Sequence, residues 1–168
     1  MGTWLNNDGL FIKFGSDEGK VGTAYGFAGE YNVLNDGMHA VEVTLTPMTA
    51  LTTTGTIVSD SVTIPNGARI HEVIVIAETA CTGATATLDV GLIDQDRSTA
   101  FDDDGLVAAL AVASIDAAGE TNVLRVGSTS AGALIGTTLT NTGLIVASYN
   151  TAAFTAGKVK VVVHYYIP

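Results

Sequence analysis

Strict two-residue alternation over residues 83–94 is the feature that most constrains how this chain can fold. The segment reads G-A-T-A-T-L-D-V-G-L-I-D. Every second position is apolar, namely Ala84, Ala86, Leu88, Val90 and Leu92, and the positions between them are Thr85, Thr87, Asp89 and Gly91. Because successive side chains of a strand point to opposite faces of a sheet, this pattern predicts a strand with one face on a core. The other face is polar and carries no group typical of a catalyst.

Five further segments are rich in β-branched and apolar residues and also predict strands. They cover residues 56–64, 68–78, 121–126, 144–150 and 158–167. The first of them ends at the turn sequence Pro65-Asn66-Gly67. The last is the strongest, with Val159, Val161, Val163, Tyr165 and Ile167 on the face that we expect to be core.

The segment 68–78 is apolar on both of its faces. Ile70, Ile74 and Ile76 lie on one face, and Val73 and Val75 lie on the other. Such a pattern predicts an inner strand that is covered on both sides.

Residues 106–118 leave two alternatives open. Leu106, Leu110 and Ala113 have helical spacing and alanine has high helix propensity, yet two short strands fit equally well. Many short strands with Gly-, Asn- and Thr-rich turns, and no regular alternation with helices, predict an all-β fold. We expect an antiparallel β-sandwich over residues 51–168.

Residues 1–50 differ in composition from the remainder, because glycine and aromatic residues are frequent in them. This composition predicts an extended N-terminal arm or a set of loops. Glycines at positions 9, 15, 19, 22, 26, 29 and 37 interrupt this region, and they oppose both helix and long alternation. Six of the eleven aromatic residues lie between them: Trp4, Phe11, Phe14, Tyr25, Phe27 and Tyr31. These rings are either anchors that dock the arm on a partner, or a cover for the domain's own core.

The charge balance restricts the partners of the chain. Of 168 residues, 14% are charged, against about 25% in a typical domain, and 7 basic residues face 17 acidic ones for a net charge of −10. Direct binding to nucleic acid or to an anionic membrane is therefore disfavoured, because both need clustered Lys and Arg. The acidity serves solubility or suits a partner with a basic surface. The N-terminus does not read as a secretory signal, and no apolar run reaches the roughly 20 residues of a membrane span.

Catalytic motifs are missing from the sequence. His39, His71 and His164 are far apart, and neither a nucleophile elbow nor a phosphate-binding loop is present. The single cysteine, Cys81, excludes a disulfide within the chain and fits synthesis in a reducing cytosol. Cys81 is either a nucleophile with His71 as its base or an inert thiol without a catalytic role. We expect no enzyme activity and no cofactor.

An acidic segment, D-Q-D-R-S-T-A-F-D-D-D-G over residues 94–105, is the best chemical candidate. Its five carboxylates could supply oxygen ligands for calcium. It departs from an EF-hand loop, because the sixth position is Thr99 and the twelfth is Gly105. The alternative is a solvated acidic loop between two strands, and the sequence does not decide between the two.

Two stretches carry a resemblance to a known family. Residues 64–94, I-P-N-G-A-R-I-H-E-V-I-V-I-A-E-T-A-C-T-G-A-T-A-T-L-D-V-G-L-I-D, and residues 155–165, T-A-G-K-V-K-V-V-V-H-Y, resemble strands of capsid decoration (cement) proteins of tailed phages. The similarity covers residues 56–168 and leaves out the first fifty residues. It implies a jelly-roll-like sandwich, present as a homotrimer on the outer capsid surface of the virion, made in the host cytoplasm and bound to the major capsid protein.

Two other classes of function stay open beside this resemblance. One is a receptor- or carbohydrate-binding module of a phage head or tail fibre, and the gathering of aromatics in the arm counts against it. The other is a small cupin-like enzyme, which would need more metal-binding side chains on neighbouring strands than His71 and His164 provide.

Overall fold

The chain divides into two units, Met1–Gly37 and Met38–Pro168. The structure, a computed structural model, describes residues 3–5, 11–13, 38–59, 61–97 and 100–168. In the first unit, strands β1 (Thr3–Leu5) and β2 (Phe11–Lys13) pair antiparallel with Trp4 opposite Ile12. The sequence pattern predicts an arm or loops for this region and does not predict these two strands. Strands of three residues are too short to show the alternation from which a strand is predicted.

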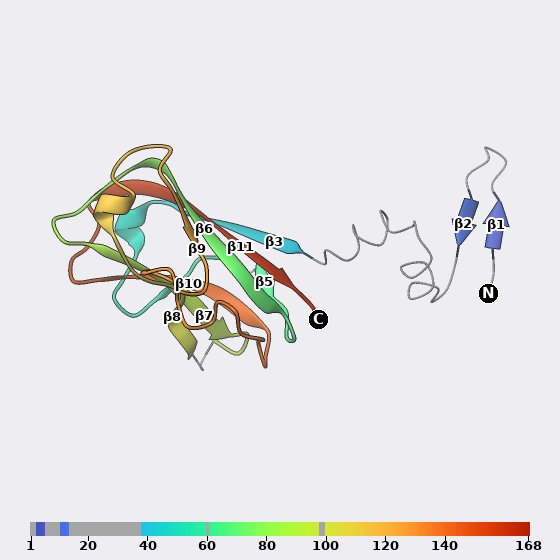
Figure 1. Ribbon diagram of the computed structural model, residues 1–168. Coiled ribbons are helices and arrows are strands. Elements are labelled where there is room, and N and C mark those ends of the chain that lie inside the picture. Colours follow the sequence, from blue (N-terminus) through green and yellow to red (C-terminus); the bar gives the residue numbers. More distant parts are fainter. Residues whose placement is uncertain (1–2, 6–10, 14–37, 60, 98–99) are drawn as a thin grey trace. The chain divides into compact units, whose positions relative to one another are not determined.

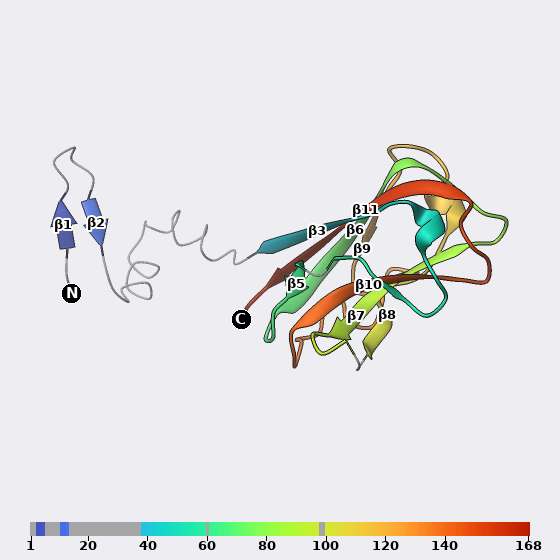
Figure 2. The same ribbon diagram turned by 180° about the vertical axis from the view of Figure 1, so that it is seen from behind.

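The second unit consists of two antiparallel sheets, drawn from opposite sides in Figures 1 and 2. Sheet one has the order β3 (His39–Leu45), β11 (Ala156–Tyr166), β6 (Arg69–Thr82) and β9 (Thr121–Leu124). Sheet two contains β4 (Thr56–Ile57), β5 (Thr63–Ile64), β10 (Gly143–Asn150), β7 (Thr87–Asp94) and β8 (Ala100–Ala111), with β4 and β5 both paired to β10. Two 3-10 turns, η1 (Met48–Ala50) and η2 (Val112–Ser114), complete the described elements. The predicted all-β antiparallel sandwich is confirmed.

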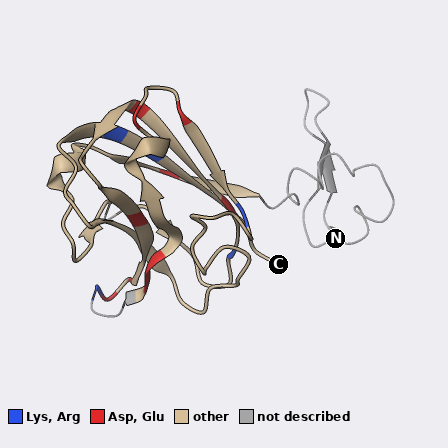
Figure 3. Cartoon of the chain, turned by 60° about the vertical axis from the view of Figure 1, so that its left-hand side comes forward, with Lys and Arg blue, Asp and Glu red and all other residues tan. Residues whose placement is uncertain are grey.

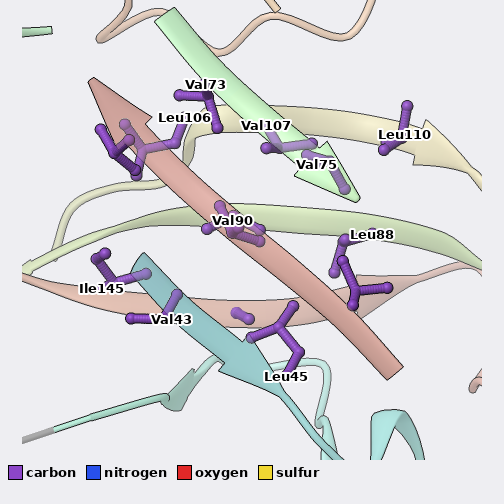
Figure 4. Packing of buried hydrophobic residues seen from close by; sticks show 14 of the residues in the cluster. Val43, Leu45, Val73, Val75, Leu88, Val90, Leu106, Val107, Leu110 and Ile145 are labelled. Atoms are coloured by element: carbon purple, nitrogen blue, oxygen red, sulfur yellow. The ribbon is translucent and has the colours of Figure 1, made fainter. Parts of the chain in front are cut away.

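The core lies between the two sheets, as Figure 4 shows from close by. Sheet one contributes Val43, Leu45, Val73, Val75, Val159, Val161 and Val163, and sheet two contributes Leu88, Val90, Leu106, Val107, Leu110 and Ile145. Each of these side chains is at most 4% exposed. Removal of this apolar surface from water is the main force that holds the sheets together.

The sandwich begins earlier in the sequence than residue 51. Strand β3 pairs with β11 over its whole length, from His39 opposite Tyr165 to Leu45 opposite Val159. Its Val43 and Leu45 are buried in the core. Because residues 1–50 are rich in glycine, their sequence predicts an arm, and the short alternation of β3 was therefore missed.

The strand predictions for β7, β10 and β11 are confirmed, and two details of facing are wrong. Ile70 faces the core together with Val73 and Val75, because the pairing of β6 with β11 shifts by one residue between Glu72 and Ile70. A β-bulge of this kind moves a side chain from one face to the other. Ile167 lies beyond the end of β11 and is 52% exposed, so it is not part of the core.

Strand β6 is an inner strand of sheet one but packs on the core with one face only. It lies between β11 and β9. Its outward side chains Ile74 and Ile76 are half-buried rather than covered. The prediction of cover on both sides is therefore wrong for the outer face.

Two other segments fold differently from their predictions. Residues 106–111 are the second half of β8, and residues 112–114 form η2, so the helix alternative for residues 106–118 is wrong. The predicted single strand over residues 56–64 is instead the separate two-residue strands β4 and β5.

Strand β8 contains a large irregularity opposite Gly91. Val90 pairs with Val107 and Leu92 pairs with Asp102, so a step of two residues along β7 matches a step of five along β8. A Cβ atom at Gly91 would overlap the backbone of Asp102 and Asp103, so only glycine admits this close approach of β8. The acidic residues that the sequence assigned to a loop, Asp102–Asp104, therefore lie within a bulged strand.

Candidate functional surfaces

The six aromatic residues predicted to dock on a partner are not brought together by the described part of the chain. Trp4 and Phe11 belong to strands β1 and β2. Phe14, Tyr25, Phe27 and Tyr31 lie outside the described residues. Their role in docking stays a prediction.

The outer face of sheet one carries an apolar row across three strands. Val162 of β11 pairs with Ile74 of β6, and Ile74 pairs with Val123 of β9. Val123 is 45% exposed, and the other two side chains are half-buried. This row gives the sheet an outward surface of aliphatic side chains.

On one side of this row, two residues further along the strands, Glu72 contacts a histidine and an arginine. Glu72 Oε1 lies 2.9 Å from His164 Nδ1, and Glu72 Oε2 accepts a 2.7 Å hydrogen bond from Arg125 Nε. The hydrogen bond with His164, followed by that with Arg125, holds the pKa of Glu72 below its ordinary value although the side chain is only 12% exposed. The buried carboxylate is therefore ionised and satisfied.

On the other side of the row, in the opposite direction along the strands, lies an ion-pair network. Lys158 Nζ lies 2.6 Å from Glu78, and Lys160 Nζ lies 2.9 Å from Glu42 and 3.5 Å from Glu78. The hydrogen bond from Lys158 lowers the pKa of Glu78. The hydrogen bond that Lys160 donates to Glu42 raises the pKa of Lys160. Figure 3 shows how sparse charges are over the sandwich as a whole. Because Glu42, Glu78, Lys158 and Lys160 are already paired, the part of the outer face around the row could lie against another protein without burying these charges unmatched.

The acidic segment forms a triad of carboxylates on β8. Oxygen atoms of Asp102, Asp103 and Asp104 lie within 4.8 Å of one another. Asp94, which the sequence groups with them, instead accepts a 3.0 Å hydrogen bond from Asn141 Nδ2. Burial raises the pKa of Asp102 to about 6, and the neighbouring Asp104 and Asp103 contribute in the same direction. The triad can attract a divalent cation through its oxygens or a basic group of a partner.

Replacing Asp102 with Asn should stabilise the protein at neutral pH. The pKa of Asp102 is raised from 3.8 to about 6 in the folded state, so the folded protein loses stability as the pH rises between these values. The ionised carboxylate therefore costs stability above pH 6, by at most about 3 kcal/mol and by about 1 to 2 kcal/mol after allowance for solvent screening. Urea unfolding at about pH 4 and about pH 7.5 should show a gain for D102N only at the higher pH. The same substitution at the exposed Asp116 is the matched control, and an equal gain at both pH values would contradict the prediction.

The described histidine and cysteine side chains do not form a catalytic site together. His39 stacks on Tyr165 with ring centroids 5.3 Å apart, and His164 is held by Glu72. Cys81 is fully buried, and burial raises the pKa of its thiol, which is the wrong direction for a nucleophile. Its Sγ atom donates a weak 3.8 Å hydrogen bond to the Thr79 carbonyl, so the inert-thiol interpretation fits this geometry.

Over the residues that the structure describes, no helix has the length and apolar character needed to cross a membrane. Neither the protein-family models nor the curated protein sequences contain a match to this chain.

Chains from solved phage capsid structures are similar to this chain, and two of them share its fold with a TM-score of 0.50. A chain of the cyanophage Pam1 capsid asymmetric unit is 20% identical, with a TM-score of 0.50, over 78% of this chain and 85% of its own length. A chain of the Ralstonia phage GP4 capsid is 19% identical, with a TM-score of 0.50, over 78% of this chain and 84% of its own. A chain of the acid-stable capsid of Helicobacter pylori bacteriophage KHP30 is 18% identical, with a TM-score of 0.48, over 78% and 88%. The sandwich of this protein is thus a fold that chains of phage capsids also have.

Proposed function

We propose that this protein is a virion structural protein, a capsid decoration (cement) protein that binds the major capsid protein and stabilises the shell. The observation that carries the proposal is the fold shared with chains of the Pam1 and GP4 capsids over 78% of this chain. In this role the protein is a homotrimer on the outer capsid surface, made in the host cytoplasm. It acts through packing alone, without catalysis, cofactor, direct nucleic-acid contact or membrane contact.

The surface chemistry of the sandwich supports this proposal. Paired charges and an aliphatic row on the outer face of sheet one suit contact with another protein. The buried thiol and the separated histidines offer no reactive group at this surface. Strands β6 and β11, which carry most of the outer face, are long and centrally placed in the sheet. A rigid sheet of this kind keeps its contact residues in place at little entropic cost.

Binding to shells tests the proposal directly. Full-length protein should cosediment saturably with undecorated shells of the phage that encodes it, and should raise the temperature at which these shells open. Fully decorated particles should take up none, which controls for non-specific adhesion. Saturable binding to a glycan without binding to shells would contradict the proposal and favour a receptor- or carbohydrate-binding module.

A further inference from the structure

A cationic hollow lies at the edge of sheet one, between the start of β6, the end of β11 and the segment that follows β9. It has a volume of about 250 Å³ and is lined by Arg69, His71, Arg125, Val126 and Tyr166 among others. Two of the three arginines of the chain and one of its three histidines therefore meet at one place. In a chain with a net charge of −10, this concentration of basic side chains is exceptional.

The cationic groups of the hollow are available to a ligand. Arg69 is exposed, and among the described residues it has neither an ion pair nor a side-chain hydrogen bond. Arg125 is 65% exposed and uses its Nε for Glu72, so its two terminal amino groups have no partner among residues described in the structure. A guanidinium with free amino groups is suited to bidentate binding of a carboxylate.

An exposed apolar side chain accompanies these charges. Val126 is 72% exposed, more than any other large hydrophobic residue in the described part of the chain. A Cβ atom at Gly136 would overlap the Cγ2 atom of Val126, so Val126 is packed against the backbone of the loop beside the hollow. Charged groups beside an exposed aliphatic side chain are typical of a protein-binding site rather than of a site for a free ion.

We propose that the hollow binds the Asp102–Asp104 triad of a second copy of this chain. The triad provides the complementary charge: Asp103 and Asp104 are exposed, and oxygen atoms of the three carboxylates lie within 4.8 Å of one another. The hollow is at the edge of sheet one, and the triad is on β8 of sheet two. Each copy can therefore bind one neighbour through its hollow and another neighbour through its triad.

The surroundings of the triad within its own chain support this pairing. The groups that raise the pKa of Asp102 besides burial are Asp104 and Asp103, so the causes of the shift are carboxylates rather than a cation of the described chain. Docking in the hollow of a neighbour would relieve this repulsion and satisfy the free guanidinium groups at the same time. A contact between two different patches is heterologous, so repetition gives either a closed ring or an open filament. A closed ring of three copies is the homotrimer of the proposed function.

The inference deepens the proposed function by assigning its self-contact, and it can be tested without a shell. Sedimentation velocity of the full-length protein, in EDTA, should show association at about 50 mM NaCl. The dissociation constant should weaken at least about tenfold at about 500 mM NaCl, because screening acts on exposed charges. A monomer at both salt concentrations would overturn the inference even if the protein binds shells, and failure to bind shells would leave the self-contact intact.

Two charge reversals and their mixture give the decisive result. Arg69→Glu places a carboxylate in the hollow beside Arg125, and Asp103→Arg places a guanidinium in the triad between two carboxylates. Each variant alone should therefore be monomeric while keeping the wild-type β-type circular dichroism. An equimolar mixture of the two should associate again, because the altered triad of one variant fits the altered hollow of the other and the unaltered halves also match. Since the two variants must alternate, the mixture forms pairs, even-numbered rings or open chains, whereas a closed ring of three needs the wild-type chain. The exposed Asp116→Arg changes charge equally and should associate like wild type. Wild-type association of either single variant, or a mixture that stays monomeric, would overturn the proposal.

Discussion

Replacing Val161 with Asp should unfold the sandwich or lower its stability by several kcal/mol. Val161 is fully buried in the middle of β11, and in the sheet it lies between Val43 of β3 and Val75 of β6. An aspartate there has no cationic partner, and an uncompensated buried charge costs about 3 to 5 kcal/mol. Since a domain of ordinary stability has about 5 to 15 kcal/mol in all, little would remain.

Urea denaturation followed by circular dichroism measures this effect. The control is the same substitution at Val123, which is 45% exposed on β9 and should lose less than about 1 kcal/mol. An unchanged denaturation midpoint for V161D would show that the assigned facing of β11 is wrong. Equal losses for both variants would show that strand propensity, not burial, sets the cost.

The sequence predicted the strands in which alternation is regular and missed the places where the ladder is irregular. Val159, Val161 and Val163 could be assigned to the core because nothing interrupts the period of two. Ile70 could not, because the bulge that turns it inward depends on its pairing with β11. Register belongs to the pair of strands, and the sequence of one strand alone does not contain it.

The same limit applies to the surfaces. The sequence predicts a loop for Asp102–Asp104 because they belong to an acidic segment with five carboxylates, whereas the bulge of β8 opposite Gly91 sets them within a strand. The hydrogen bond between Glu72 and His164 joins residues 92 positions apart, and the cationic hollow joins the start of β6 to the end of β11. No local motif could have shown these groupings. The only signal was the outward position of His164 on a strongly predicted strand.

Removing residues 1–37 should abolish binding to undecorated shells while leaving the sandwich folded. All core residues named for the sandwich lie in the unit Met38–Pro168, so the truncated protein retains both sheets. If Trp4, Phe11 and Phe14 are docking anchors, each buried ring contributes about 2 kcal/mol or more. Their joint loss should weaken binding by more than about 100-fold.

Cosedimentation with shells and thermal unfolding by circular dichroism together decide what the arm does. A truncated protein that melts cooperatively but stays in the supernatant supports the docking role, and full-length protein with all three rings replaced by Ala should behave in the same way. An insoluble or molten truncated protein would instead mean that the arm covers the core of its own domain. A truncated protein that folds and binds shells at full strength would assign docking to the sandwich. In that case the aliphatic row of Val162, Ile74 and Val123, with its paired charges on either side, becomes the surface to mutate next.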